Sequence, residues 1–499
     1  MEAGSGDPDP TSLSGLSEFL ASWATYSSTS HLDRLRQSDY SRLDALNHVY
    51  LDYTGAGLYG DSQIRAHVEL LSADVLGNPH SGSLASSATT GLVERARASV
   101  LAWFNAPPGE YTAIFTANAT AALKHVGESY PFATGSRLLL TFDNHNSVNG
   151  IREFARARGA TVAYAPLTMP DLRVDRDRLS NLLRLAEPGH PHLFAYPAQS
   201  NFSGVRHPLA LVAEAQGHGW DVLLDAAAFA PTSRLDVASV RPDFVAVSFY
   251  KLFGYPTGVG CLIARNATLA RLRRPWFSGG TVNFASAHGL AHILAPHEAG
   301  FEDGTINFLA IPAVEIGLRH LAAVGLDAIH ERVRCLAGWT LRELMALKHG
   351  NGHHMVRIYG PSDTTDRGGT LTFNLYDPEG RLLDYRRVEE LATADRISLR
   401  TGCFCNPGSG ETAEGITDDD VRAALESGLD LTLPRFVQVI QHRGGKSAGA
   451  IRASFGLVSN FADAWRFVRF IAGFRDQTKL TIGDVTFDIE SCRVVRDGS

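Results

Sequence analysis

Lys251 stands where a side chain can do chemistry, because it closely follows a run of residues typical of a buried strand. The strand-like run covers 244–248, and a turn rich in glycine and proline follows the lysine up to Gly258. A lysine in this position can reach into a pocket and form a Schiff base with an aldehyde. The alternative is a solvated surface lysine, since most lysines are exposed.

Asp225 closes another strand-like run, Asp221-Val-Leu-Leu-Asp225. Pyridoxal 5′-phosphate (PLP) is an aldehyde cofactor that needs a carboxylate at its pyridine nitrogen, because a protonated ring withdraws electrons from the substrate. An aspartate at a strand end of the same sheet suits this role. The alternative is that Asp225 caps the helix that follows it.

Hydroxyl groups that suit a phosphate lie at a predicted helix start and in a glycine turn. Ala119 and Thr120 open a helical segment after the strand 112–115, and helix N-termini bind phosphate through free N–H groups. Ser248 and the turn Ser278-Gly-Gly-Thr281 can supply further donors. Helix capping and turn formation are the alternatives for each of these residues.

His145 and Asn201 each follow a further predicted strand. An imidazole at position 145 can stack on a cofactor ring, and the amide of Asn201 can hydrogen-bond a ring oxygen. The alternatives are a loop histidine that is satisfied by its neighbours and an asparagine that forms a turn.

Two cysteines lie one residue apart in the segment Arg400-Thr-Gly-Cys-Phe-Cys405-Asn-Pro-Gly408. A nearby arginine and a loop rich in glycine and proline favour an exposed thiolate. A metal site is the alternative, but no second pair of Cys or His at zinc spacing accompanies these two, so we predict no metal. Arg452 interrupts an apolar strand and suits either a substrate carboxylate or an internal salt bridge.

The elements that must position these residues alternate between strand and helix from about residue 91 to 264, which predicts a mostly parallel sheet with helices on both faces. Ligands bind at the carboxyl ends of such strands. We expect a disordered leader over 1–14 and an N-terminal segment over 15–60 that packs with a small domain. A large domain should cover 61–312, and the small α+β domain should cover 313–478 and begin with a long helical stretch to 347. The tail over 479–499 should form a hairpin between 480–482 and 485–489.

Composition narrows the class of protein further. The net charge is −7 and no long cluster of lysine or arginine occurs, which argues against a nucleic-acid or membrane partner. Five scattered cysteines argue against a secreted disulfide framework. The N-terminus lacks the pattern of a signal peptide, and no apolar run is long enough to span a bilayer. We therefore expect a cytoplasmic enzyme that acts on small molecules.

Together these residues resemble the class V aminotransferases of PLP fold type I, and more closely the desulfurase-type N-terminal domain of molybdenum cofactor sulfurases. The resemblance runs through most of the chain, and its segments are Tyr50-Leu-Asp, Gly77-Asn-Pro-His-Ser81, Ile114-Phe-Thr-Ala, Ala198-Gln-Ser-Asn-Phe-Ser-Gly-Val-Arg206, Ser248-Phe-Tyr-Lys-Leu-Phe-Gly, Phe301-Glu-Asp-Gly-Thr305, Arg400-Thr-Gly-Cys-Phe-Cys-Asn406 and Ile451-Arg-Ala-Ser-Phe-Gly456.

The resemblance implies a seven-stranded sheet and a role for each candidate residue. At the cofactor, these roles are Lys251 as the Schiff-base lysine, Asp225 at the pyridine nitrogen, His145 stacked on the ring, Asn201 at the ring hydroxyl, and Ala119, Thr120 and Ser248 at the phosphate. At the substrate, Arg452 and Arg400 bind the carboxylate and Cys405 is the persulfide cysteine. In a homodimer, Thr281 or Thr305 reaches the phosphate of the neighbouring subunit. The resemblance also implies a substrate that is L-cysteine or derived from it, release of alanine, and a sulfur acceptor that is molybdenum cofactor or a protein.

The chain departs from its relatives at several positions. Compared with simple cysteine desulfurases, Tyr250 replaces a histidine and Ala228 replaces a glutamine, as in the sulfurases. Plant and animal sulfurases carry a third cysteine where this chain has Gly408-Ser-Gly410, and they continue into a further domain, of which 489–492 is at most a remnant. Two other functions remain open, namely a PLP-dependent C–S lyase acting on a cysteine conjugate and a non-catalytic scaffold.

Overall fold

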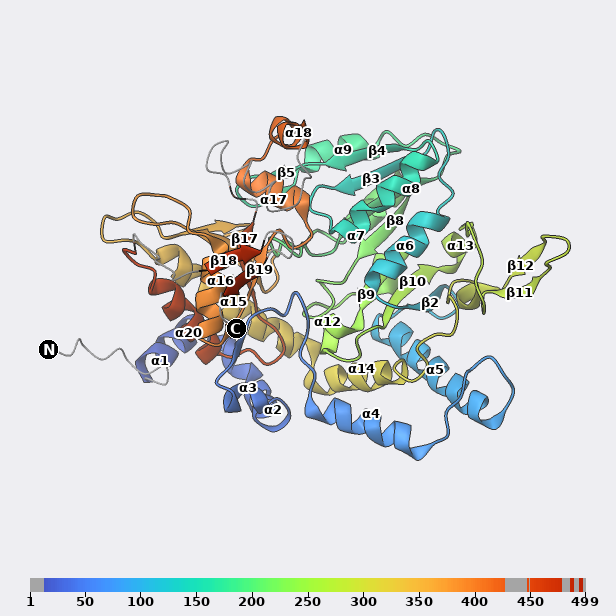
Figure 1. Cartoon of the computed structure of the whole chain (residues 1–499), viewed down its shortest axis with the longest axis horizontal. Helices are drawn as coiled ribbons and strands as arrows, with labels where there is room; N and C mark the ends of the chain where they lie inside the picture. The colour runs from blue at the N-terminus through green and yellow to red at the C-terminus, as the bar shows by residue number, and fades with distance from the viewer. Residues whose placement is uncertain (1–12, 427–446, 448, 478–484, 489–492, 497–499) are drawn as a thin grey trace.

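A seven-stranded sheet forms the centre of the larger lobe (Figure 1). The computed structural model describes residues 13–426, 447, 449–477, 485–488 and 493–496. In spatial order the strands are β2 (Tyr111–Thr116), β10 (Gly260–Arg265), β9 (Phe244–Ser248), β8 (Trp220–Asp225), β7 (His192–Pro197), β3 (Arg137–Thr141) and β4 (Thr161–Ala165). β10 runs antiparallel to both of its neighbours, whereas the pairs from β9 to β4 are parallel.

Helices cover both faces of this sheet, which explains why its strands read as continuous apolar runs. In β3, Leu138 and Leu140 join the core on one face, while Leu139 joins the core on the other. Helices α6 (Ala119–Ser129) and α8 (Ile151–Ala157) pack on the first face. On the opposite face lie α5 (Leu84–Trp103), α10 (Leu211–Gly217) and α14 (Pro312–Val324). The predicted α/β fold with a mostly parallel seven-stranded sheet is thereby confirmed.

Further helices and strands connect the elements of this lobe. They are α4 (Asp61–Ala73), α7 (Asn146–Asn149), β5 (Leu167–Thr168), β6 (Arg173–Val174), α9 (Arg176–Leu183), α11 (Val237–Val240), α12 (Phe249–Phe253), α13 (Asn266–Leu269), β11 (Val282–Ala285), β12 (His292–Leu294) and η2 (His297–Gly300). The hairpin β11–β12 projects from the lobe (Figure 1), and neither it nor β4 was expected from the sequence.

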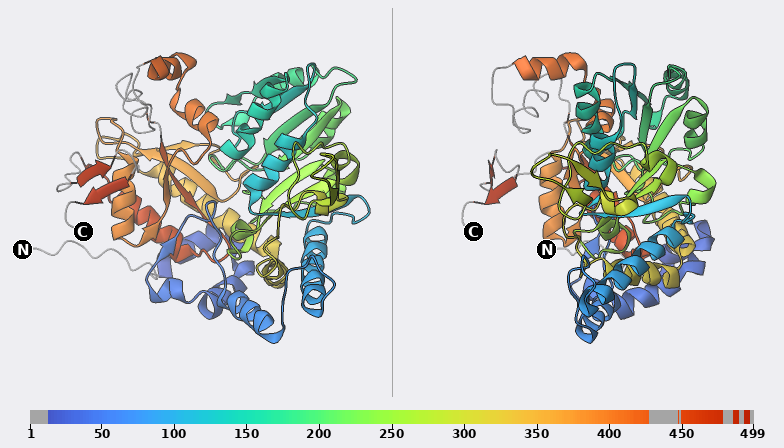
Figure 2. Two further views of the ribbon diagram at one scale, coloured as in Figure 1. Left: turned by 45° about the vertical axis from the view of Figure 1, so that its right-hand side comes forward. Right: turned by 90° about the vertical axis from the view of Figure 1, so that its right-hand side faces the viewer.

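A four-stranded antiparallel sheet organises the smaller lobe (Figure 2). Its order is β13 (Val356–Tyr359), β14 (Thr370–Leu375), β17 (Ala450–Ser454) and β16 (Arg400–Gly402). The helices that accompany it are α15 (Leu326–Ala346), α16 (Tyr385–Ala394), α17 (Pro407–Glu414), α18 (Asp418–Glu426) and α20 (Phe461–Ala472). The long helical stretch expected from 313 to 347 is broken at Gly325, whose φ of +90° interrupts the helix between α14 and α15.

The N-terminal helices lie against the smaller lobe (Figure 1). They are α1 (Leu13–Ser22), η1 (Ala24–Thr29), α2 (His31–Asp39) and α3 (Arg42–Ala45). The strand β1 (Val49–Tyr50) then pairs with β15 (Ile397–Ser398), and Arg36 forms a buried ion pair with Asp463 of α20. Segments far apart in the sequence are therefore joined by backbone pairing and by charge.

Both chain ends differ from the expectation. Leu13 and Ser14 begin α1, and the rest of the predicted leader lies outside the described residues. At the other end β18 (Val485–Asp488) pairs with β19 (Arg493–Arg496), whereas 480–482, its predicted partner, lies outside the described residues. Within the described part of the chain, no helix combines the length and apolarity needed to cross a bilayer.

A buried ion pair holds β2 in place. The Arg97 guanidinium of α5 donates to the Glu302 carboxylate at 2.7 Å, and the same carboxylate accepts the backbone N–H of Phe115 at 2.8 Å. Removing one member of a buried pair leaves the other charge without compensation. The exposed Glu94 also lies 3.3 Å from Arg97, but solvent screens this second contact.

We expect Glu302→Ala to lower the free energy of unfolding by about 3–5 kcal/mol, because it removes the buried partner of the Arg97 guanidinium and leaves the backbone N–H of Phe115 without its acceptor. Glu94→Ala, which removes an exposed partner of the same arginine, is the matched control and should cost less than about 1 kcal/mol. Urea unfolding followed by circular dichroism measures both. Equal losses in the two variants would contradict the structural role of the buried pair.

Candidate active site

A cavity of about 420 Å³ opens at the carboxyl ends of the central strands. This volume suits a cofactor or a small-molecule substrate. The predicted residues that line it are Ala119, Thr120, His145, Asn201, Asp225, Ser248 and Lys251. Residues from five different strand ends or helix starts are thus brought to one place, as expected for an α/β sheet.

Lys251 lies in α12, a helix of little more than one turn that follows β9 directly, and its side chain reaches the cavity. Gly254, in the left-handed conformation with φ +80°, ends that turn. Desolvation lowers the pKa of the Lys251 amine; the Asp225 carboxylate opposes this shift, and the nearby guanidinium of Arg452 adds to it. A lysine with a lowered pKa carries a larger fraction of neutral amine, which is the nucleophilic form.

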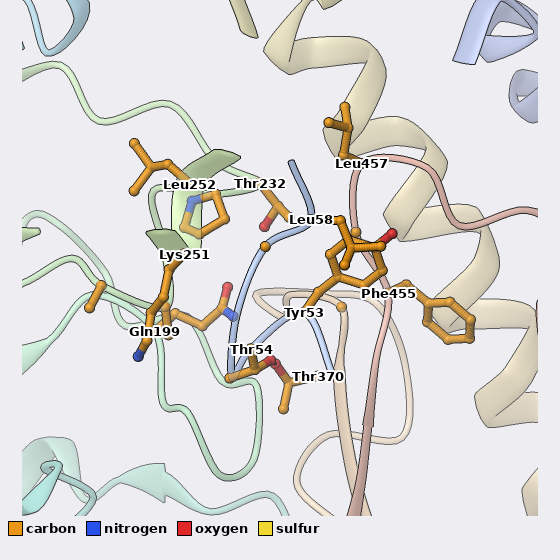
Figure 3. Close-up of a pocket in the computed structure, with 16 residues that line it drawn as sticks. Tyr53, Thr54, Leu58, Gln199, Thr232, Lys251, Leu252, Thr370, Phe455 and Leu457 are labelled. Atoms are coloured by element: carbon orange, nitrogen blue, oxygen red, sulfur yellow. The ribbon is translucent and has the colours of Figure 1, made fainter. Parts of the chain in front are cut away.

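A second, smaller pocket lies behind the lysine (Figure 3). Lys251 and Gln199 stand at one wall of this pocket, and Tyr53 and Phe455 of the other lobe stand across from them (Figure 3). Gln199 and Lys251 line both cavities. The lysine therefore sits where the two lobes meet.

Asp225 is the last residue of β8 and is 7% exposed. One of its carboxylate oxygens accepts the backbone N–H of Ala227 at 3.0 Å in a turn, and no helix begins there, so Asp225 does not cap a helix as the sequence allowed. The same side chain also lines the cavity together with Lys251. A buried carboxylate and an amine of lowered pKa consequently share one cavity.

Three hydroxyl groups gather beside the N-terminus of α6. Asn118 caps this helix, and the backbone N–H of Ala119 donates to the hydroxyl of Ser248 at 3.1 Å. The hydroxyl of Thr120 lies 2.8 Å from that of Ser147. Hydroxyl donors at the positive end of a helix dipole form an environment that suits a phosphate group.

His145 follows β3 and caps α7, where its Nδ1 accepts the backbone N–H of Ser147 at 3.1 Å. Burial lowers the pKa of this imidazole, the cations Lys251 and Arg452 lower it further, and Asp225 opposes them. The neutral ring therefore carries its proton on Nε2, since Nδ1 acts as an acceptor. A neutral, flat ring at the cavity wall suits stacking on an aromatic cofactor.

Asn201 connects the cavity to the loop that carries the paired cysteines. Its amide nitrogen donates to the carbonyl of Phe404 at 2.8 Å, and its amide oxygen accepts from Asn406 at 2.9 Å. The backbone N–H of Asn146 donates to the carbonyl of Cys405 at 2.7 Å. Cys405 is exposed, and its backbone is bonded to the residue that follows His145.

Burial distinguishes the cysteines. Cys261 and Cys335 are buried, and burial raises the pKa of their thiols to about 12 and about 11. Cys403 is partly exposed and Cys405 is exposed, whereas Cys492 lies outside the described residues. In the described part of the chain no group of three or more His, Cys, Asp or Glu side chains is placed to hold a metal ion.

Arg400 and Arg452 share the carboxylate of Asp52, at 2.6 and 3.0 Å. Arg452 is 2% exposed and also donates to the backbone carbonyl of Asn201 at 3.0 Å. The salt bridge that the sequence left open is therefore present. Two guanidinium groups on one carboxylate leave a net positive charge, although neither arginine lines the cavity itself.

Thr281 and Thr305 lie apart from the Lys251 cavity. Thr281 is fully buried and exchanges hydrogen bonds with Ser278 in its own turn. Thr305 lines another cavity, of about 370 Å³, which shares only Ala117 and Gly258 with the first. The contact of either threonine with a neighbouring subunit stays a prediction.

Several residues of the site were missed from the sequence. Gln199 lines the cavity, and its buried side-chain oxygen has no hydrogen-bond partner. Its position two residues before Asn201 could have identified it as a residue of the site. Asp143 and His207 form a fully buried pair at 2.7 Å next to the cysteine loop. Nothing local marks that pair, because its members are far apart in the chain.

The geometry agrees with comparisons against known proteins. The model of the family Aminotransferase class-V matches residues 49–467. The chain belongs to the class-V aminotransferase family. The predicted family is thus confirmed for most of the chain.

Relatives within this family carry one recurrent name. The molybdenum cofactor sulfurase of Solanum lycopersicum is 37% identical over 486 residues, which cover 91% of this chain and 59% of that protein. The one of Homo sapiens is 37% identical over 471 residues, which cover 89% of this chain and 51% of that protein. The chain therefore spans roughly half to three fifths of the length of these relatives.

Solved structures share the fold at lower identity. The apo cysteine desulfurase of Thermococcus onnurineus NA1 superposes with a TM-score of 0.72 at 22% identity, covering 88% of this chain and 97% of that one. A cystine C–S lyase in complex with cysteine persulfide superposes with a TM-score of 0.63 at 20% identity, covering 86% and 98%. This likeness shows that the chain shares the fold of these two proteins.

We expect Lys251→Met to raise the unfolding free energy of the cofactor-free protein at pH 7, because a desolvated amine is removed. The lowered pKa means that the unfolded chain binds this proton more readily than the folded chain. The gain in unfolding free energy should be full at pH values below the pKa of Lys251 in the folded protein. It should vanish as the pH rises through the pKa of lysine in the unfolded chain, which is about 10.4. Urea unfolding between pH 7 and 10.5 measures it. The exposed Lys124→Met is the control, and an equal, pH-independent effect of both would refute the desolvation.

Proposed function

We propose that the chain is a PLP-dependent sulfurtransferase of the cysteine desulfurase type. It takes sulfur from L-cysteine, or from a substrate derived from it, onto Cys405 as a persulfide. One observation carries the proposal. A desolvated amine and a buried carboxylate share a cavity whose wall is bonded to a loop with an exposed thiol.

The residues present fit PLP. Lys251 meets the need for an amine, Asp225 suits the pyridine nitrogen, and the hydroxyls at the start of α6 suit the phosphate. The buried oxygen of Gln199 lacks a partner, and a ring hydroxyl would satisfy it. Simple desulfurases have a glutamine at the position of Ala228, and Gln199 lines the same cavity as Ala228.

When bound, PLP would withdraw electrons from the substrate Cα and make its proton acidic. Lys251 would remove that proton, and its lowered pKa favours the neutral form that this step needs. Asp225 would hold the proton at the ring nitrogen, and His145 would pack against the ring.

Cys405 completes the reaction as a nucleophile. Its thiolate attacks the substrate sulfur, so that a sulfur–sulfur bond forms while the carbon–sulfur bond of the substrate breaks. The electron pair of the broken bond stays on the substrate Cβ, which takes up a proton, Lys251 returns a proton to Cα, and alanine leaves. Cys405 then carries the persulfide to an acceptor.

Charge supports recognition of an amino-acid carboxylate. Asp52 neutralises only one of the two guanidinium groups that contact it, so Arg400 and Arg452 retain one positive charge. The Nε of Arg452 is buried and has no partner. We assign the substrate carboxylate to this cluster, with Arg452 as the donor.

The acceptor is proposed from the name of the relatives, and the assembly is proposed from the family resemblance. Molybdenum cofactor, or a protein that passes sulfur on to it, is the proposed acceptor, as the name of the relatives indicates. We propose a homodimer in which Thr281 or Thr305 of one subunit approaches the phosphate of the other. A reducing compartment such as the cytoplasm would keep the thiol of Cys405 available.

We expect protein purified with PLP to show the visible absorbance of the bound cofactor, and Lys251→Ala to lose it after dialysis, because the covalent attachment is gone. Absorbance spectra and the PLP content after denaturation measure this. Lys124→Ala, which changes an exposed lysine, should keep both. A protein that cannot be reconstituted would favour a scaffold.

We expect Cys405→Ser to lower persulfide formation from cysteine at least about tenfold, which corresponds to about 1.4 kcal/mol in the barrier. Cys403→Ser is the matched control, since it removes the other cysteine of the same loop. Mass spectrometry of the modified cysteine and of the amino-acid product measures both. Pyruvate in place of alanine would instead identify a C–S lyase.

A further inference from the structure

The loop that carries Cys405 has an unusual backbone. Phe404 and Cys405 are consecutive and have φ values of +55° and +54°, and Gly402 before them has φ +107°. The left-handed region is unfavourable for residues with a Cβ, and two such residues in a row persist only where surrounding contacts enforce them. The conformation of this turn must therefore be held from outside.

Hydrogen bonds from the larger lobe hold it. Asn201 donates to the carbonyl of Phe404 at 2.8 Å, and the backbone N–H of Asn146 donates to the carbonyl of Cys405 at 2.7 Å. The amide nitrogen of Asn406 donates both to the side-chain oxygen of Asn201, at 2.9 Å, and to the backbone carbonyl of Asp143, at 2.7 Å. Each bond crosses from the smaller lobe to the larger one.

Asn406 is central to this set because it is fully buried and uses both ends of its amide. Its oxygen caps α17 by accepting the N–H of Ser409 at 3.2 Å, while its nitrogen makes the two contacts across the lobes. The acceptor of the second contact is well anchored, since the Asp143 side chain pairs with His207 at 2.7 Å. Capping and cross-lobe bonding are therefore separable by mutation.

Packing adds to the same constraint. The ring of Phe404 lies 5.5 Å from that of Phe202, and the guanidinium of Arg452 lies 4.7 Å from the centre of the Phe404 ring. These two contacts fix the position of the Phe404 ring. Because Phe404 is fixed, the position of Cys405 depends on whether the side-chain amides of Asn406 and Asn201 make their hydrogen bonds.

We propose that Asn406 is a positioning residue whose amide nitrogen, through Asn201 and the Asp143 carbonyl, holds the turn 403–406 in its strained form and keeps Cys405 beside the cavity. Loss of these bonds lets the turn relax away from the larger lobe. Because Asn201 also lines the cavity, a ligand that engages its amide changes the hold on the loop. The role of this movement in sulfur transfer rests on the proposed function, but the hold itself does not.

The test uses Asn406→Ser and Asn406→Asp in the cofactor-free chain of 499 residues. Both side chains still cap α17, and both lack the amide N–H groups. Hydrogen exchange read by mass spectrometry should be about tenfold faster or more in the peptides that contain 403–406 and Asn146, and unchanged in the rest of α17. Asn460→Ser is the matched control, because Asn460 caps α20 in the same way.

The same variants provide a kinetic readout. With PLP and cysteine, the rate constant for persulfide formation should fall about tenfold, while KM for cysteine should stay within about twofold, since Asn406 is not assigned to the substrate. Wild-type exchange rates at 403–406 in both variants would overturn the proposal. If the variants exchange faster but the wild-type protein forms no persulfide, the positioning role of Asn406 stands and the proposed function is refuted.

Discussion

Desolvation of the Lys251 amine is the constraint around which the site is built. The lysine reaches the cavity on a five-residue helix after β9, and the smaller lobe covers its other side with Tyr53 and Phe455. Water is thereby displaced, and the free energy of solvating an ammonium group is lost. The neutral amine is favoured as a result, and Asp225 in the same cavity is the charge that keeps this shift within limits.

The two lobes are joined by polar contacts as well as by the chain. Arg452 of β17 donates to the backbone carbonyl of Asn201, while the asparagines 201 and 406 bond across the gap to each other and to neighbouring carbonyls. Polar contacts of this kind have strict geometry, so they specify one relative placement of the cysteine loop and the cavity. They can also be broken and remade more readily than an apolar interface, which suits the delivery of sulfur by this loop that we propose.

Strain and reactivity meet in the same turn. Cys261 and Cys335 are inert because burial raises the pKa of their thiols, whereas Cys405 is exposed on a backbone that needs support from elsewhere. The bonds that support it originate at the ends of β3 and β7, which also carry His145 and Asn201. The position of the thiol is thus linked to the groups that line the cavity.

Local signals in the sequence were sufficient for the strands β3, β7, β8 and β9, for the polar residues at their ends, and for the helix start at Ala119, because side-chain periodicity and capping depend on near neighbours. They did not reveal the antiparallel direction of β10, the break at Gly325, the sharing of Asp52 by two arginines or the pairing of Asp143 with His207. Apart from the break at Gly325, which lies in the local backbone, those features are contacts between segments far apart in the chain. Their energies exist only after the lobes have packed, so tertiary structure alone decided them.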